Sequence, residues 1–352
     1  MTRLMNSKNL NSFNYIVIVF LFLNVSALAH ADSATDYQSG IEAYEKGDFK
    51  TALEKWKLSA YQGQIEAQFG LGSMYDQGLG VTQDYQEAIK WYGLAAEQGY
   101  AKAQYNLGWM FYKGKGVTQD YQKAFKWYHL AAEQGQASAR SVLGTMYQIG
   151  RGITQDYKEA FKWYHLAAEQ GQASAQYNLG VMYFNGQGVI RDYSEAVKWY
   201  RLSAEQGKAT AQFSLGSMYD NGLGVTQDYQ EAFKWYRLAA EQGIAEAQFV
   251  LGSMYNSGEG VIQDYKEAAK WYRLSANQEI AEAQYKLGVM YADGQGVNQD
   301  YVQAHKWLNI SGANKHEMGN KGRGVIEKLM TSGQIAMAQK LARKWMKQHG
   351  MK

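Results

Sequence analysis

The chain of 352 residues contains no cysteine and no proline. Without cysteine it can form neither a disulfide framework nor a zinc site with thiolate ligands. Without proline, no residue forces a kink into a helix or favours a cis peptide bond. Hydrophobic residues still make up 46% of the chain and aromatic residues 14%. These shares suffice for a continuous core and argue against disorder.

Motifs that would indicate catalysis are missing as well. The six histidines show no HExxH spacing, and the chain holds no GxSxG, no Ser-x-x-Lys and no P-loop. The many Gly-x-Gly pairs belong to loops, since no predicted strand precedes them. We therefore expect no enzyme, no cofactor and no metal site.

Charges nearly balance over the whole chain but are unevenly distributed. Residues 32–314 carry a net charge of −6, whereas residues 315–352 carry +7. A negatively charged body disfavours electrostatic binding of nucleic acid. Only the basic C-terminal segment is suited to an anionic surface such as a membrane or an acidic partner.

The first 31 residues have a composition of their own. Arg3 and Lys8 precede an apolar run over residues 15–23, and small residues surround Ala29 and Ala31. This pattern predicts a secretory signal peptide cleaved near Ala31 and a periplasmic or secreted product. The alternative is an uncleaved membrane anchor, although the apolar run is shorter than the roughly 20 residues that span a bilayer.

A repeat of 36 residues runs through most of the remaining chain, in seven copies without insertion or deletion. Each copy has a tryptophan followed by Tyr or Leu, and a glycine further upstream. The tryptophans are Trp91, Trp127, Trp163, Trp199, Trp235, Trp271 and Trp307, and the glycines are Gly72, Gly108, Gly144, Gly180, Gly216, Gly252 and Gly288. Such a period predicts a stacked array of one structural unit, which presents an extended binding surface.

Residues 64–99 show how one copy is built. Apolar residues with helical spacing predict a first helix over about 64–76, ended by Gly78. Gly72 recurs inside this helix, where glycine costs roughly 1 kcal/mol relative to alanine. We interpret its recurrence as close approach of the partner helix.

The second predicted helix runs from about residue 84 to residue 98. Asp84 and Glu87 have the spacing of a capping box. Tyr85, Trp91 and several alanines form a broad apolar face. A single hairpin cannot bury both of its apolar faces, so stacked neighbours must do so.

The full pattern AQ-aromatic-x-LG-x-M-Y-x-x-G-x-G-V-x-x-DY-x-x-A-x-KWY-x-x-AAEQG resembles the Sel-one-like repeat, a relative of the tetratricopeptide repeat, over residues 64–315. The resemblance implies an all-α fold: a right-handed α/α superhelical solenoid of helix–turn–helix repeats with helical caps. It also implies an adaptor for protein complexes, as in bacterial envelope signalling regulators and host-interaction factors. The chain lacks the family's frequent loop proline and the cysteine pairs of some relatives. The penicillin-binding activity ascribed to those relatives is therefore not supported.

Both ends of the array differ from the repeat. Residues 32–63 align with a shortened, degenerate unit, and residues 316–352 form a basic segment. Ile335, Ala338, Leu341, Ala342 and Trp345 make one apolar stripe, which predicts a terminal capping helix. The alternative is a basic amphipathic helix that binds membranes or acidic partners.

Positions that vary among copies of the first helix trace one face opposite the predicted core. By the resemblance, this face lines the concave surface of the array. The residues predicted to bind a partner there are Lys102, Asn106, Trp109, Lys113, Val142, Thr145, Ile149, Asn178, Val181 and Asn185. Apolar residues such as Trp109 and Val181 on a face expected to be exposed favour a groove for a protein or peptide. The alternative is ordinary scatter of apolar residues on a surface.

A second variable row follows the second helices. It consists of Gly93, His129, His165, Arg201, Arg237, Arg273 and Asn309. Equivalent residues of stacked helices lie too far apart to share a metal ion, so we expect a solvated charged face. The whole pattern predicts a non-catalytic interaction scaffold of the bacterial envelope. The alternative is a protein that binds peptidoglycan or another cell-wall glycan.

Overall fold

The computed structural model describes residues 33–350, and every regular element in this range is a helix. This confirms the predicted all-α fold class. The predicted signal peptide, residues 1–31, lies outside the described residues.

Helices follow one another in pairs along the chain. Residues 33–45 are helical, and α2 covers Phe49–Tyr61. The first helices of the seven repeats are α3 (Ile65–Gln77), α5 (Ala101–Lys113), α7 (Ala137–Ile149), α9 (Ala173–Asn185), α11 (Ala209–Asn221), α13 (Ala245–Ser257) and α15 (Ala281–Asp293). The second helices are α4 (Tyr85–Glu97), α6 (Tyr121–Glu133), α8 (Tyr157–Ala168), α10 (Tyr193–Glu205), α12 (Tyr229–Glu241), α14 (Tyr265–Asn277) and α16 (Tyr301–Ala313). Two further helices, α17 (Glu317–Glu327) and α18 (Ser332–Gln348), end the described chain.

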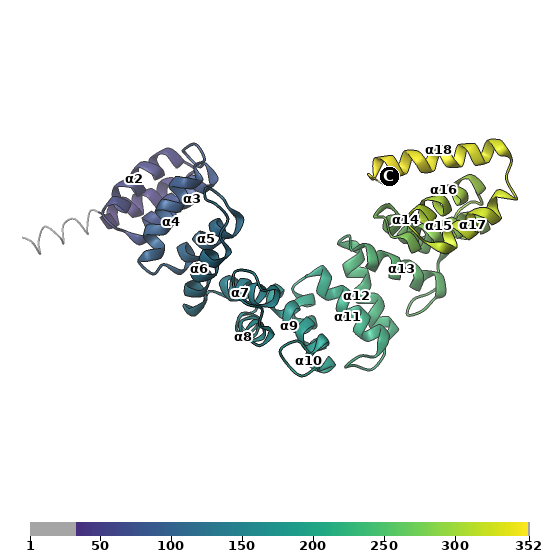
Figure 1. Ribbon diagram of the computed structural model, residues 1–352, viewed down its shortest axis with the longest axis horizontal. Coiled ribbons are helices and arrows are strands. Elements are labelled where there is room, and N and C mark those ends of the chain that lie inside the picture. Colours follow the sequence, from purple (N-terminus) through teal and green to yellow (C-terminus); the bar gives the residue numbers. More distant parts are fainter. Residues whose placement is uncertain (1–32, 351–352) are drawn as a thin grey trace, which may run out of the picture. The chain divides into compact units, whose positions relative to one another are not determined.

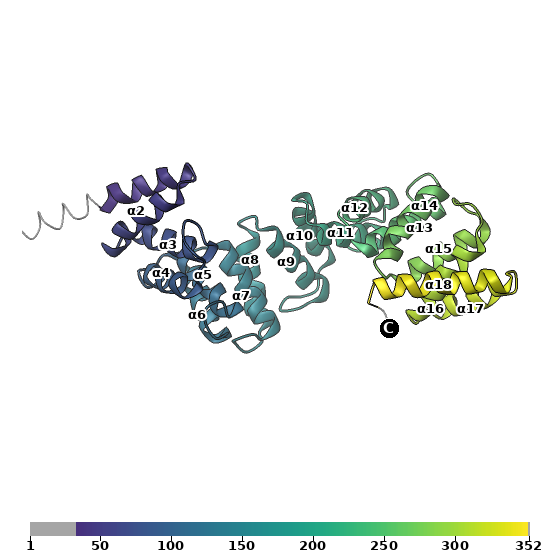
Figure 2. The ribbon, with the colours of Figure 1, turned by 90° about the horizontal axis from the view of Figure 1, so that it is seen from above.

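The chain forms two compact units that divide after Gln170. The first unit includes α2 to α8, and the second includes α9 to α18. Within each unit, successive helices pack side by side as hairpins, and each hairpin contacts the next (Figures 1 and 2).

Local signals set the helix ends. Gly78 ends α3 in the left-handed conformation with φ of 71°, and the Asp84 side chain caps α4 by accepting from the backbone N–H groups of Gln86 and Glu87. The predicted reciprocal contact of Glu87 with the cap is replaced by other bonds. The Glu87 carboxylate accepts from the Trp91 indole at 3.1 Å and from the Lys90 ammonium at 3.1 Å.

Two glycines of each repeat allow close packing. A Cβ atom on Gly72 would lie 2.5 Å from the Tyr92 ring of the partner helix, which confirms the predicted close approach. A Cβ atom on Gly80 would lie 2.5 Å from the Phe49 carbonyl oxygen of the preceding hairpin. Gly80 therefore serves the packing between hairpins as well as the turn.

A buried glutamine joins successive hairpins. Gln248 Nε2 donates to the Ala240 carbonyl at 3.1 Å, and Gln278 Nε2 donates to Gln248 Oε1 at 2.8 Å. The same pair recurs in most copies, but in the third copy Arg140 Nε donates to the Ala132 carbonyl at 3.1 Å in place of the glutamine. These bonds satisfy backbone carbonyls at the ends of second helices.

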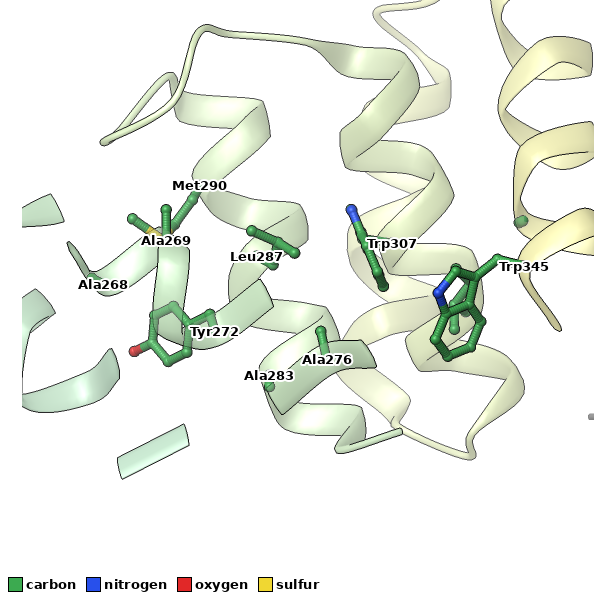
Figure 3. Close-up of a cluster of buried hydrophobic side chains, with 11 residues drawn as sticks. Ala268, Ala269, Tyr272, Ala276, Ala283, Leu287, Met290, Trp307 and Trp345 are labelled. Atoms are coloured by element: carbon green, nitrogen blue, oxygen red, sulfur yellow. The ribbon is translucent and has the colours of Figure 1, made fainter. Parts of the chain in front are cut away.

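The core of each unit is a row of alanine, leucine, methionine and aromatic side chains. In the second unit this row continues into the terminal helix (Figure 3). Trp345 of α18 meets Trp307 of α16 edge to face, with ring centroids 5.7 Å apart. Ala338 and Ala342 are fully buried beside it, while Lys340, Arg343, Lys344 and Lys347 are exposed.

The glycine-rich helix α17 was not expected from the sequence. A Cβ atom on Gly319 would lie 2.7 Å from Ser311 Oγ, and one on Gly322 would lie 3.0 Å from Leu308. The glycines therefore let α17 pack closely on α16. This packing compensates for the low helix propensity of glycine.

Candidate functional site

A hollow of about 170 Å³ lies on the first-helix face of the first unit, between α5 and α7. Four of the predicted partner-binding residues line it. The complete lining is Tyr105, Trp109, Tyr112, Lys113, Tyr128, Val142, Thr145 and Met146. The structure thus brings part of the predicted site together within one unit.

Trp109 and Val142 are half-buried rather than fully exposed. Trp109 packs against the cores of the second and the third repeat, and Val142 packs against the core of the third. Both side chains also line the hollow. They therefore form an apolar wall that the surrounding core holds in place.

Two polar residues of the predicted site already have partners inside the protein. Thr145 Oγ1 and the Tyr164 hydroxyl are 2.9 Å apart. Asn106 lies close enough to the Tyr92 hydroxyl to interact with it, and burial raises the pKa of Tyr92 far above its ordinary value. These contacts position both polar side chains at the surface of the core.

The other predicted residues lie elsewhere. Lys102 lines a separate hollow of the first unit together with Glu66 and Trp56. Ile149, at the end of α7, is 48% exposed. The rest of the predicted set, Asn178, Val181 and Asn185, is on α9 in the second unit.

Positive charge surrounds the hollow. Lys113 lines it and stands over the Tyr112 ring, with 5.7 Å from Nζ to the ring centroid. Arg151 donates a hydrogen bond of 2.7 Å to the Tyr112 hydroxyl, which raises the pKa of the guanidinium further. This environment suits an anionic group beside the apolar wall.

Four lining residues were not in the predicted site. Met146 and Tyr128 occupy positions that sequence reasoning assigned to the core, whereas Tyr105 and Tyr112 were left out. Tyr112 was the one that a closer comparison of copies could have found. Its position holds Asp76, Tyr112, Gln148, Phe184, Asp220, Asn256 and Ala292 in the seven copies. Such variation is typical of a surface position.

The second helices carry a regular pattern of ion pairs. Lys90 and Glu87 approach to 3.1 Å, and the same i,i+3 pair recurs in α8, α10, α12 and α14. His129 lies 3.6 Å from Glu133 and stacks edge to face on Trp163. Each of these exposed ion pairs contributes at most about 1 kcal/mol to the free energy of unfolding.

Residues 33–350 hold neither a cluster of metal ligands nor a membrane-spanning helix. In this range no three histidine, aspartate or glutamate side chains come together as metal ligands would. No helix of the same range has the length and apolar character needed to cross a bilayer.

Comparison with known proteins identifies relatives of the repeat. The protein-family model described as Sel1 repeat matches residues 65–100, 101–136, 137–172, 173–208, 209–244, 245–279 and 281–316. A Sel1 repeat protein from Oxalobacter formigenes is 32% identical, with a TM-score of 0.67 over 88% of this chain and 90% of that chain. A protective antigen of uropathogenic Escherichia coli strains, which displays an SLR fold, is 29% identical, with a TM-score of 0.55 over 92% of this chain and 94% of that chain. No curated protein gave a significant match.

Proposed function

Because the chain belongs to the Sel1 repeat family, whose members are generally protein-interaction scaffolds, we propose that it is a non-catalytic scaffold. It binds a protein or peptide partner on the first-helix face. The hollow beside Trp109 is the centre of this surface in the first unit.

The observation that carries this proposal is the Trp109 hollow. Its volume of about 170 Å³ is below that of typical ligand pockets and suits one side chain of a partner. Tryptophan is a frequent anchor of protein interfaces, and here the core holds it in place. Lys113 and Arg151 favour a partner that carries a carboxylate next to its apolar side chain.

The remaining predicted residues extend this proposal. Ile149 adds exposed apolar surface at the end of α7, and Lys102 adds positive charge beside the neighbouring hollow. Asn178, Val181 and Asn185 form a corresponding surface of the second unit.

We assign this scaffold to the bacterial envelope, as a periplasmic or secreted protein. The apolar run over residues 15–23, with basic residues before it and small residues after it, supports this assignment. The similarity to a protective antigen of Escherichia coli agrees with it.

The test is chemical crosslinking in cells, with mass spectrometry of the captured proteins, for the wild type and Trp109→Ser. Serine stands at the equivalent position in three other copies, as Ser73, Ser217 and Ser253, so the variant is expected to fold. We expect capture of the main partner to fall at least about fivefold, as for the loss of an interface anchor. Val289→Ser, at the equivalent position of the seventh copy, is the matched control.

Equal capture by the wild type and Trp109→Ser would contradict the Trp109 hollow as the binding centre. Val181→Asp tests the second unit separately. Co-sedimentation of the protein with purified peptidoglycan, equal in all variants, would favour the glycan-binding alternative over a protein scaffold.

A further inference from the structure

A larger groove lies on the opposite side of the first unit, on the second-helix face. It has a volume of about 640 Å³, within the range of ligand pockets. Residues of α4, α5 and α6 line it, and most of them are apolar, among them Leu94, Phe111, Trp127 and Leu130.

The groove is open because Gly93 has no side chain. The equivalent residues of the next five copies are histidine or arginine. His129 covers Trp163 with an edge-to-face contact at 5.6 Å, and Arg273 donates to the Tyr291 hydroxyl at 2.8 Å. By contrast, apart from its chain neighbours and the backbone of its own helix, no atom lies within 4 Å of the place where a Gly93 Cβ would be.

Trp127 is therefore more accessible than most of its equivalents. Trp91, Trp163, Trp199, Trp271 and Trp307 are buried, whereas Trp127 is half-buried. Trp235 is also half-buried, but its indole nitrogen is enclosed. Trp127 thus presents its ring to the groove.

The floor of the groove differs from the other copies as well. Phe111 stands where the other six copies have tyrosine: Tyr75, Tyr147, Tyr183, Tyr219, Tyr255 and Tyr291. The missing hydroxyl group makes the floor apolar. Leu94 and Leu130, which are 39% and 42% exposed, flank it.

At one position of the groove's rim, a basic residue replaces the acidic residue of most other copies. Lys123 stands where five other copies have glutamate. In those copies the glutamate pairs with the lysine three residues later, and in α4 and α10 it also accepts from the indole N–H. Within residues 33–350, Lys126 has no acidic partner and the Trp127 N–H has no acceptor.

Three lysines and one glutamate line the groove, and Lys126 is the lysine among them without an acidic partner within residues 33–350. Lys123 Nζ lies 3.7 Å from Asp120 Oδ2 and stands over the Phe111 ring at 5.4 Å from the centroid. Lys90 is paired with Glu87, and Glu97 is the one acid that lines the groove. An incoming carboxylate would complete the ion pair that the change from glutamate to lysine removed.

We propose that this groove is a second interaction site, which binds a protein segment with an exposed aromatic or aliphatic side chain next to carboxylates. The apolar side chain packs on Trp127 and Phe111, and the carboxylates pair with Lys123 and Lys126. Three departures from the repeat, at Gly93, Phe111 and Lys123, meet in this one groove. A membrane is a poorer fit, since anionic bilayers attract clusters of about 4–8 basic residues.

A selection experiment with displayed peptides tests the proposal. Random peptides of about 12 residues, long enough for one anchor and its flanks, are selected on the mature protein and counter-selected on Gly93→His. We expect the enriched sequences to combine an aromatic residue or leucine with adjacent Asp or Glu. A synthetic peptide of the enriched sequence is then titrated against each variant by fluorescence anisotropy.

The repeats supply matched variants that are expected to fold. Gly93→His introduces the residue of the next copy, and Lys123→Glu restores the residue of five other copies. Each is expected to weaken binding at least about tenfold, as for the loss of a central contact. Trp109→Ser is expected to leave this binding unchanged, which separates the groove from the proposed function of the first-helix face. The double variant His129→Gly, Glu159→Lys is expected to open a second groove over Trp163 and raise the stoichiometry from one peptide to two.

Several results would overturn the proposal. They are failure to enrich any peptide, enrichment of peptides without an acidic residue, and equal affinity of the wild type and Gly93→His. Circular dichroism checks that every variant keeps its helicity. Sedimentation of the protein with phosphatidylglycerol vesicles, lost in Gly93→His, would assign the groove to an anionic lipid surface instead.

Discussion

Equivalent residues of the seven copies show what single positions contribute. The turn after each second helix needs a positive φ, and glycine supplies it at Gly63, Gly99, Gly135, Gly171, Gly207 and Gly243. Glu279 and Lys315 take the same conformation at φ of 68° and 64°, where a side chain costs about 1–2 kcal/mol. The position that holds Tyr112 in the second copy holds Asp220 in the fifth copy. Asp220 is partly buried, and its carboxylate accepts a hydrogen bond from the Tyr236 hydroxyl at 3.3 Å.

Asp220→Asn is expected to stabilise the protein at neutral pH. Burial raises the pKa of Asp220, so the native state holds this proton to higher pH than the unfolded chain does. The carboxyl group therefore contributes stability at low pH that is lost as the pH rises above about 4, the ordinary aspartate value. Asparagine keeps an acceptor for Tyr236 without this loss, and an asparagine, Asn256, stands at the same position of the next copy.

The measurement is the free energy of unfolding in urea between the acidic and neutral range. The advantage of Asp220→Asn over the wild type is expected to be greatest near neutral pH and to shrink as the pH falls toward about 4. Asp293→Asn, an exposed change at the end of α15, is the control. A constant difference at all pH values would show that the carboxyl does not titrate as inferred.

At the scale of elements, helices are held in place by contacts that their own sequences do not reveal. Helix α17 contains three glycines, Gly319, Gly322 and Gly324, and it is held in place by α16. His305 is fully buried, and its Nε2 lies 2.9 Å from Glu327 Oε1. Arg323 adds a hydrogen bond of 3.0 Å to Asn309 Oδ1. These contacts dock α17 on the last repeat.

Glu327→Ala is expected to loosen this docking. The His305 Nδ1 atom has no partner, so loss of Glu327 leaves a buried imidazole without its side-chain partner, at a cost of about 1–3 kcal/mol. In this variant, exchange of the backbone amide hydrogens should become faster in α17 and α18 than in the wild type, and should change less in α13. The control is Glu317→Ala, because the Glu317 side chain is 79% exposed. Equal effects of the two substitutions would contradict a specific role of the His305–Glu327 contact.

At the scale of the whole molecule, the exact period means that the extensive contacts of a hairpin within each unit are with the hairpins next to it in the chain. In such an array, the free energy of unfolding is approximately the sum of a term for each repeat and a term for each interface between neighbouring repeats. The alanine, glutamine and glycine positions that form these interfaces are the same in almost every copy. One copy should therefore be removable without disturbing the packing of the others.

Deletion of residues 245–280 tests this property. The deletion joins Ile244 to Ala281, and the four residues that follow the junction, AEAQ, are the same as in the deleted copy. We expect the mean helicity per residue to stay unchanged and the midpoint of thermal unfolding to fall by only a few degrees, about the effect of 1–2 kcal/mol. Deletion of residues 245–262, which breaks the period, is expected to disrupt the second unit; similar behaviour of both deletions would contradict a strictly periodic array.

The helices and their pairing can be predicted from the amino-acid sequence alone. Their bounds follow from local signals, namely the Asp84-type caps, the Gly78-type ends and the apolar spacing, and these act within a few residues. The repeat period also determined the family and the fold class, because a unit that cannot bury its own faces must stack. For the same reason the role of Gly72 was predictable from its recurrence.

The way in which surface residues combine depends on how the helices pack in three dimensions. Trp109 and Val142 come from different repeats and share one hollow with Tyr112, which sequence reasoning left out. Gly93 and Trp127 lie in successive second helices, and the groove between them exists because one side chain is missing. Helix α17 likewise depends on packing against α16, which outweighs its local propensity. Such features depend on distances between helices, and a pattern along one chain does not contain these distances.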